Sequence, residues 1–308
     1  MRKPLALICC LCCISLHAQM RIMSYNVENL FDAVHDTLKS DTDFTPDGKY
    51  HWTWSRYRQK LEHLSRVVVS VGEWNPPVVV GLCEVENENC LNDLVKKSPL
   101  RNLNYSYIHK ESPDERGIDC ALLYDNNRFH LLNKAFLSVP MPTGERPTRD
   151  IVYAEGVIGK QDTLHVMMCH LPSQLGGIAA TAHKRAIAYI VLQQAVDSIL
   201  DLHPAAQIVI MGDMNAKPQD NLQRMHNLMI TMEGGDSGTH KWKGEWSCLD
   251  QFYVSDNLYQ RVKAHIYDAP WLLREDEHFG GTEPLRCYYG LRWQNGYSDH
   301  LPVYLDIR

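Results

Sequence analysis

The chain has 308 residues, of which 44% are hydrophobic and 22% are charged. This composition excludes a disordered or fibrous protein and allows a sizeable core, while the length fits one or two domains. The formal net charge of −6 is a poor match to a broad basic surface for nucleic acid. A nuclease remains compatible with this charge, because a bound divalent ion and a few arginines can supply positive potential locally.

The beginning of the chain is typical of a cleaved secretory signal, which we place at residues 1–19. Arg2 and Lys3 precede an apolar run over residues 5–16, and the small Ala18 follows it. The run is too short to span a bilayer. A short buried helix and a lipidated cysteine are the alternatives. We therefore expect an exported protein, periplasmic or extracellular.

The rest of the chain alternates strand-length apolar runs with two amphipathic helices. Runs rich in Val, Ile, Leu and aromatic residues predict strands at 21–27, 78–85, 105–109, 118–125, 164–171, 208–215, 249–254 and 301–307. Helical spacing of apolar residues predicts helices at 57–71 and 178–200. Polar, Pro/Gly-containing stretches predict surface loops at 35–55, 140–150 and 270–297. With neither a repeat nor a linker evident, we predict a single domain over residues 20–308.

Six of the ten cysteines lie after the signal, and they include no C-x-x-C pair. A zinc cage is therefore disfavoured. Cys83, Cys120 and Cys169 fall inside apolar runs, where a free cysteine usually behaves as a small hydrophobe. Export would permit disulfides, but the spacing assigns none.

Polar residues gather at or near one end of six of the predicted strands: Asn26, Glu84, His170, Asp213, Asn215, Asp250, Asp299 and His300. Taken singly, Asp and Asn are ordinary turn formers, and a lone His is more often hydrogen-bonded than catalytic. Glu84 and Asp213 are harder to explain as turns, because each directly ends an apolar run and a bare buried carboxylate is costly. If the strands stack in sheets, these ends converge on one rim, and the group predicts an active site.

Four of these segments resemble, in order, the main signatures of the endonuclease/exonuclease/phosphatase superfamily, which has the deoxyribonuclease I-like fold. The segments are IMSYNVEN, GLCEVEN, IVIMGDMNAKP and YSDHLPV. Each is short, but their order and spacing together are specific and span nearly the whole mature chain. The resemblance implies an α/β fold, a four-layered α/β/β/α sandwich with two mixed β-sheets, and an active site at the rim.

The resemblance also implies a metal site. Asn26 and Glu84 would form it, with Glu84 as the direct ligand, and Asp299 would complete the shell or polarise a second ion. Hard oxygen ligands suit Mg²⁺, with Mn²⁺ or Ca²⁺ as alternatives. Whether one or two ions act is left open by the sequence.

The remaining motif residues would carry the chemistry. By resemblance, Asp213 and Asn215 orient and deprotonate the attacking water, while His300, held by Asp250, faces the scissile phosphate. His170 resembles a histidine that contacts the phosphate and helps to protonate the leaving oxygen. A metal, a cationic imidazole and an ordered carboxylate are what phosphodiester hydrolysis requires, because negative charge builds on the phosphate oxygens.

Weaker candidates flank these motifs. Arg116, with Asp119, lies where family members often place a phosphate-proximal side chain, although a turn before a strand explains it equally well. Arg286 and Tyr288 could bind substrate, and a solvated loop is their alternative explanation.

We predict a divalent-metal-dependent phosphodiesterase, a nuclease acting on nucleic acid, monomeric and without a stable membrane span. GDMNAKP departs from the inositol phosphatase signature, and export disfavours chromosomal repair of abasic sites. The first alternative is a sphingomyelinase-like phospholipase or another phosphoesterase, which an aromatic loop tip beside the active site would favour. A non-catalytic binding module is less compatible with an intact acid–base set.

Overall fold

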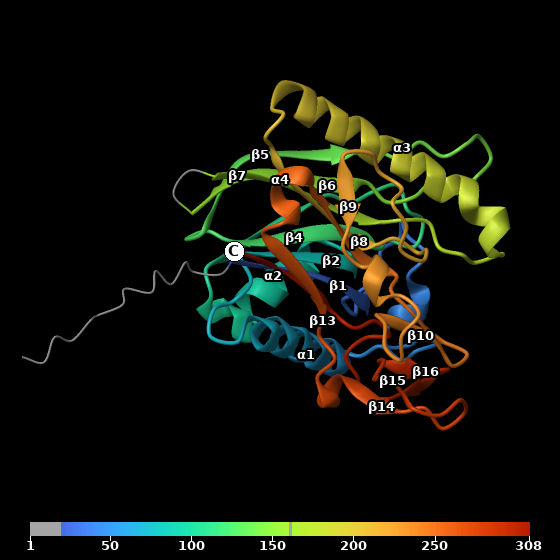
Figure 1. The fold of residues 1–308 in the computed structure, drawn as a ribbon. Helices are drawn as coiled ribbons and strands as arrows, with labels where there is room; N and C mark the ends of the chain where they lie inside the picture. The colour runs from blue at the N-terminus through green and yellow to red at the C-terminus, as the bar shows by residue number, and fades with distance from the viewer. Residues whose placement is uncertain (1–19, 160–161) are drawn as a thin grey trace, which may run out of the picture.

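The computed structural model describes residues 20–159 and 162–308, so the predicted signal at 1–19 lies outside the described residues. Two six-stranded mixed sheets form the centre of the fold (Figure 1). In spatial order, the first sheet contains β13 (Val262–Ile266), β18 (Val303–Ile307), β1 (Met20–Leu30), β2 (Val79–Val85), β4 (Asp119–Asp125) and β3 (Tyr105–His109). The second contains β5 (Phe129–Leu137), β6 (Ile151–Ile158), β7 (Asp162–His170), β8 (Gln207–Asp213), β12 (Asp250–Ser255) and β9 (Met225–Asn227). The pairs β1/β2 and β7/β8 are parallel, and the other neighbours are antiparallel.

Helices cover the outer face of each sheet (Figure 1). α1 (Trp54–Gly72) and α2 (Glu88–Lys96) pack on the first sheet, and α3 (Ile178–Leu202) packs on the second. A third apolar cluster fills the space between the sheets. The layers are therefore α/β/β/α, which confirms the predicted fold class.

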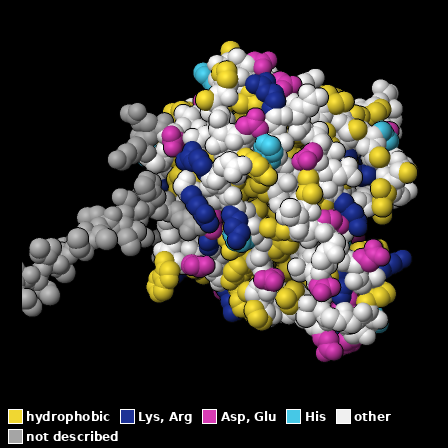
Figure 2. All heavy atoms as spheres, in the orientation of Figure 1, with side chains coloured by type: hydrophobic (Ala, Val, Ile, Leu, Met, Phe, Trp, Pro, Cys, Tyr) yellow, Lys and Arg dark blue, Asp and Glu magenta, His cyan; other side chains and the backbone are white. Residues whose placement is uncertain are grey.

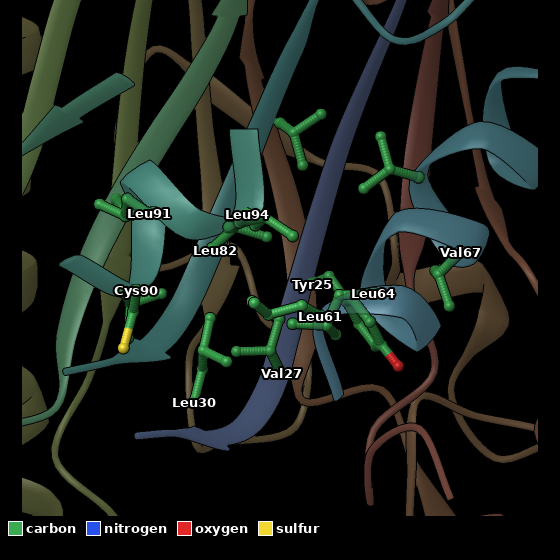
Figure 3. Packing of buried hydrophobic residues seen from close by; sticks show 14 of the residues in the cluster. Tyr25, Val27, Leu30, Leu61, Leu64, Val67, Leu82, Cys90, Leu91 and Leu94 are labelled. Carbon is green, nitrogen blue, oxygen red and sulfur yellow. The ribbon is translucent and has the colours of Figure 1, made fainter. Parts of the chain in front are cut away.

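The packing explains which sequence patterns form these elements. Strands such as β2 are buried on both faces, so they appear as continuous apolar runs rather than as alternating ones. Thr53 directly precedes α1, and its side chain caps the helix by accepting a hydrogen bond from Arg56 N. Figure 3 shows Leu61 and Leu64 of α1 beside Tyr25 and Val27 of β1, with Leu82 of β2 and Leu94 and Leu91 of α2 farther along the same cluster.

Shorter elements surround this frame. Three small two-stranded sheets pair β10 (His240–Trp242) with β11 (Glu245–Ser247), β14 (Leu273–Glu275) with β15 (Thr282–Pro284), and β16 (Tyr288–Tyr289) with β17 (Arg292–Trp293). Helical turns lie at Thr42–Phe44, Pro99–Asn102, Ile230–Met232, Pro270–Leu272 and α4 (Asp256–Tyr259). The predicted loop at 270–297 is thus partly wrong, because strands of two or three residues carry no detectable periodicity. The predicted loop at 35–55 also fails in part, since Trp52 is buried in the core and α1 begins at Trp54.

The surface and the cysteines agree with a folded core. The six cysteines of the described residues are free and buried, as expected for small hydrophobes. Basic and acidic side chains are interspersed on the face shown in Figure 2. Within the described part of the chain, every helix is too short or too polar to cross a membrane.

Candidate active site

Asp213 lies at the centre of the polar cluster because of its position in the second sheet. It ends β8, and the sheet register places His170 of β7 on one side of it and Asp250 of β12 on the other. These three residues, separated by 37 or more positions in the chain, therefore meet at one sheet edge.

Gly212 allows the backbones of β7 and β8 to approach closely beside Asp213. Its φ is +141°, and a Cβ at this position would lie 1.8 Å from the carbonyl oxygen of Cys169. Any side chain would force β7 and β8 apart. The glycine of the GDMN motif is thus required by the approach of two backbones next to Asp213.

The Asp213 carboxylate is buried among hydrogen-bond donors. Its Oδ2 lies 3.1 Å from Asn26 Nδ2, 3.5 Å from His170 Nε2 and 3.8 Å from His300 Nε2. Its Oδ1 accepts a 2.8 Å bond from the backbone N–H of Asn215, whose own φ is +47°. Burial raises the pKa of Asp213, and the charge of His300 opposes that rise. The carboxylate is therefore suited to accept a proton.

His300 is held by a second carboxylate. Its Nδ1 lies 2.7 Å from Asp250 Oδ2, and Asp250 is itself fixed by the bond that its backbone N–H donates to Thr239 Oγ1. Burial alone would lower the pKa of His300, but Asp250 and Asp213 raise it well above its ordinary value. The imidazole is consequently a cation facing Asp213.

Two further histidines are neutral. Burial, followed by the charges of Arg149 and Arg116, lowers the pKa of His170 well below its ordinary value. Burial beside the cationic His300 also lowers the pKa of His240 to about 4. The His240 ring lies 4.8 Å from the His300 ring, and the two residues form a β-bridge. The sequence offered no motif for His240, because it becomes a neighbour only through this bridge.

The predicted metal pair lies where the first sheet meets Asp213. Glu84, with a φ of +67°, has Oε2 2.9 Å from Asn29 N and Oε1 3.5 Å from Asn26 Nδ2. Asn26 Oδ1 accepts a 3.1 Å bond from Glu28 N. Backbone in this sparsely populated region is a known feature of ligand clamps.

Glu28 is a site residue that the sequence analysis missed. Its Oε2 accepts a 2.7 Å bond from Cys287 N, and burial beside Asp299 raises the pKa of the Glu28 carboxyl. Asp299 is paired at 2.9 Å with Arg286. A divalent cation would relieve the repulsion between these two part-buried carboxylates. The oxygen-only set of Glu84, Asn26, Glu28 and Asp299 is the kind that Mg²⁺ prefers.

The weaker candidates lie around this centre. Arg116 lies near Glu84 and His170, because the charge of Glu84 raises the pKa of Arg116 and the charge of Arg116 lowers the pKa of His170. Asp119 is buried and accepts a bond from Ser112 N, so its contacts are structural. Tyr288 lines an aromatic pocket with Glu28, and its hydroxyl donates to the carbonyl of Tyr50.

Arg149 was also missed, because it lies in a stretch predicted only as a loop. It is 4% exposed and lies 3.4 Å from Asp114 Oδ2. Its charge acts on His170, which places it beside the polar cluster. No local sequence pattern predicts that Arg149 lies near His170.

Comparison with known proteins agrees with this geometry. A family model described as "Endonuclease/Exonuclease/phosphatase family" matches residues 21–308. Comparison with the curated proteins finds no match.

Solved structures share the fold at low sequence identity. TDP2 from D. rerio, complexed with single strand DNA product, has a TM-score of 0.59 and 16% identity over 94% of this chain and 99% of that chain. The human Nocturnin catalytic domain with bound sulfate anion has a TM-score of 0.59 and 15% identity over 94% of both chains. A mannosyl-6-phosphatase from Bacteroides thetaiotaomicron has a TM-score of 0.57 and 14% identity over 94% of this chain and 99% of that chain.

The family match and the polar cluster support a phosphoesterase, and members of this family depend on divalent metals. With a model that matches nearly all of the described residues, the chain belongs to the endonuclease/exonuclease/phosphatase family.

Proposed function

We propose that this chain is an exported, divalent-metal-dependent phosphodiesterase that hydrolyses nucleic-acid phosphodiester bonds. The observation that carries the proposal is the position of Asp213, whose carboxylate is within 3.8 Å of Asn26, His170 and His300. A proton acceptor, a cationic imidazole and neutral donors at one point are the parts that this hydrolysis requires.

In the proposed reaction, Asp213 accepts the proton of the attacking water. Its two oxygens are fixed by Asn215 N and by the Asn26 amide, so the carboxylate has one orientation. His300, with its ring set by Asp250, faces the phosphate as a cation and stabilises the charge that builds on the phosphate oxygens. As the water oxygen bonds to phosphorus, the bond to the leaving oxygen breaks and that oxygen takes up a proton; His170, a neutral imidazole, assists its departure with a hydrogen bond from Nε2.

Glu84, Asn26, Glu28 and Asp299 would hold the metal. A bound divalent ion supplies a Lewis acid for the phosphate oxygens in this chemistry. The repulsion between Glu28 and Asp299 and the strained backbone of Glu84 support this assignment.

Two observations support nucleic acid as the substrate. Arg116 and Arg149 bring positive charge to His170 in a chain that is acidic as a whole. A protein of the same fold, TDP2 from D. rerio, holds a single strand DNA product. Export rests on the residues of the predicted signal alone.

Hydrolysis of bis-p-nitrophenyl phosphate by the mature protein tests the proposal. We expect turnover with Mg²⁺ or Mn²⁺, arrest by EDTA, and a fall of about 10²-fold or more in His300→Ala and in Asp213→Ala. His226→Ala is the matched control. His226 forms a 2.7 Å pair with Asp256, which directly follows β12 at the end opposite to Asp250. Activity that is indifferent to EDTA, or retained in both site variants, would end the proposal.

A parallel screen of DNA, RNA, sphingomyelin and phosphoinositides then identifies the substrate. Turnover of DNA or RNA above that of the lipids is the expected result. Export has its own test, in which an antibody to the mature chain is used to detect the protein in secreted and cell-associated fractions.

A specific observation favours a lipid substrate as the second candidate. Trp242, Phe279 and Tyr289 are 65%, 61% and 41% exposed, and they line a cavity of about 640 Å³. Arg286 lines the same cavity and pairs with Asp299 of the site. Exposed aromatic turns beside an active site suit a membrane interface.

Hydrolysis of sphingomyelin in vesicles distinguishes this candidate. If it is right, Trp242→Ser with Phe279→Ser lowers hydrolysis of vesicle lipid by a larger factor than hydrolysis of bis-p-nitrophenyl phosphate. Trp74→Ser is the matched control, because Trp74 is 100% exposed and follows α1. Equal losses on both substrates would dismiss the lipid candidate.

A further inference from the structure

A cavity of about 230 Å³ opens beside the reaction centre, on the side of His170. Pro172 and Ser173, which directly follow the His170–Leu171 pair, form one wall. The loop 114–116 and the segment 146–149 form two more, and the first turns of α3 close the cavity with Thr181 and Lys184. Its lining brings together the cations Arg116, Arg146, Arg149 and Lys184 against the anions Asp114 and Glu115.

The floor of this cavity contains buried donors without a partner. Arg149 is 4% exposed, yet its Nη2 has no hydrogen-bond partner among residues 20–159 and 162–308, and its Nε makes only an ion-pair contact with Asp114. Thr148 is 6% exposed, and its hydroxyl likewise finds no partner in the described part of the chain. A buried donor that is left unsatisfied costs about 1–3 kcal/mol, and more when it is charged. Such a pair of donors points to a ligand that brings acceptor oxygens.

The charges of the cavity identify that ligand as an anion. Asp114 is shared, with Oδ2 3.4 Å from Arg149 Nε and Oδ1 3.5 Å from Arg116 Nε. One carboxylate therefore balances two guanidinium groups. Burial and then the neighbouring Arg149 lower the pKa of Arg116, while Asp114 and the more distant Glu84 act against this shift.

The two outer cations have acidic partners of their own, and only Arg146 is held loosely. Arg146 Nε lies 3.5 Å from Glu115, with side chains 83% and 55% exposed, so this pair is weak in water. Lys184 pairs at 2.8 Å with Glu145, a residue that also accepts from His183. An incoming phosphate could take Arg146 as a partner at little cost and share Lys184 with Glu145, and a guanidinium fork matches phosphate oxygens in pairs.

We propose that this cavity is a second phosphate subsite, which binds the phosphate next to the scissile one along a nucleotide strand. The inference rests on the proposed function for its choice of substrate. It assigns to Thr148, Arg149, Arg146 and Lys184 the task of selecting substrates that carry a second phosphate. A diester without a neighbouring phosphate would leave the buried donors unpaired.

Binding without hydrolysis tests the subsite directly. In EDTA, the mature protein is titrated by calorimetry with the dinucleotide TpT and with its terminally phosphorylated forms pTpT and TpTp. We expect at least one phosphorylated form to bind about tenfold more tightly than TpT, the size of one charge-assisted contact. TpT carries a single phosphate and cannot fill the reaction centre and the subsite together. Equal affinities for the three dinucleotides would therefore overturn the subsite.

Variants locate the preference. Thr148→Val, and Arg146→Gln combined with Lys184→Gln, should each reduce the ratio of affinities toward unity, while the control Arg224→Gln should keep it. Arg224 has the same charge but pairs with Asp201, away from the cavity lining. Arg149→Lys, checked for folding by its thermal unfolding, removes the fork and should reduce the ratio as well. A ratio that survives in all three variants would place the phosphate elsewhere.

Kinetics separates this inference from the proposed function. With Mg²⁺, kcat/KM for the phosphorylated dinucleotide should exceed that for TpT by about the same tenfold factor. If bis-p-nitrophenyl phosphate is hydrolysed but no dinucleotide preference appears in either assay, the subsite fails and the hydrolase stands. If the preference in binding appears without any hydrolysis, the subsite stands and the proposed function fails.

Discussion

His170 and Asp213 end two neighbouring parallel strands and lie opposite each other in the register of β7 and β8, with His170 Nε2 3.5 Å from Asp213 Oδ2. The sheet itself therefore sets their spacing, without help from a loop. Because the parallel pair is buried on both faces, neither residue can move without disturbing the core.

His170 should act as a neutral group throughout the neutral pH range. Burial and the adjacent arginines lower its pKa well below the ordinary value, so the ring already lacks its extra proton above about pH 6. His170→Gln should consequently reduce kcat/KM by about tenfold, the loss of one hydrogen bond, by the same factor from about pH 6 to about pH 9. The pH–rate profiles of the two proteins check this. A ratio that changes tenfold per pH unit would show that His170 titrates in the reaction.

Asp250→Asn should remove the charge that keeps His300 cationic and oriented. Asp250 Oδ2 lies 2.7 Å from His300 Nδ1, and the asparagine side chain retains the shape without the negative charge. We expect kcat to fall by about 10²-fold, as for loss of a positioned acid–base partner. Asp256→Asn breaks the equivalent His226 pair on the surface and should leave kcat near that of the wild type. Comparable losses in the two variants would argue against a special role for Asp250.

Several of the strands that the sequence predicted are buried on both faces. β2, β7 and β8 appear as unbroken apolar runs, whereas β5 alternates little and keeps several exposed residues, because it lies at the edge of its sheet. α2 was missed for the same kind of reason, since a helix of nine residues gives little periodicity.

The site residues also fall into those that the sequence identified and those that it missed. Motif residues at strand ends were identified because strand ends share a rim, and the structure brings Asn26, Asp213 and His300 within contact. Arg149 and His240 depend on contacts between segments far apart in the chain, with no local pattern to mark them. The assigned chemical roles are still predictions, which the variants described here can test.

Gly212→Ala should destabilise the protein and displace Asp213. The new Cβ would lie 1.8 Å from the carbonyl oxygen of Cys169, in addition to the strain of a φ of +141°. We expect a loss of about 3 kcal/mol or more in the free energy of unfolding, measured by urea denaturation. Gly234→Ala separates the two causes, because Gly234 has a φ of +82° with no atom within 4 Å. That control should cost only about 1 kcal/mol.

Glu84→Gln should weaken metal binding without unfolding the protein. The glutamine retains one oxygen for the bond from Asn29 N but removes the charge that would attract the cation. Calorimetric titration with Mn²⁺ should give an affinity lower by about tenfold or more than that of the wild type. Thermal unfolding in EDTA should be nearly the same for both proteins. An unchanged affinity for Mn²⁺ would move the metal site away from Glu84.

Lys241 and Asp276 should make stability depend on acid pH. Lys241 Nζ lies 2.7 Å from Asp276 Oδ2, the side chains are 4% and 5% exposed, and the bond from Lys241 lowers the pKa of Asp276 from 3.8 to about 2. Because the folded pKa is depressed, the stabilisation is fully present above the unfolded pKa of 3.8 and is lost as pH falls through about 2.

Asp276→Asn isolates this contribution, since the amide oxygen can still accept the bonds from His278 N and Phe279 N. The variant should be less stable than the wild type at neutral pH, because Lys241 is left buried without its counter-charge. The difference in unfolding free energy should shrink between pH 3.8 and about 2. Asp201→Asn, with a side chain 72% exposed in its pair with Arg224, should change the unfolding free energy by less than about 1 kcal/mol at any of these pH values. A difference between wild type and Asp276→Asn that stays constant down to the lowest pH would mean that the ion pair contributes nothing to folding.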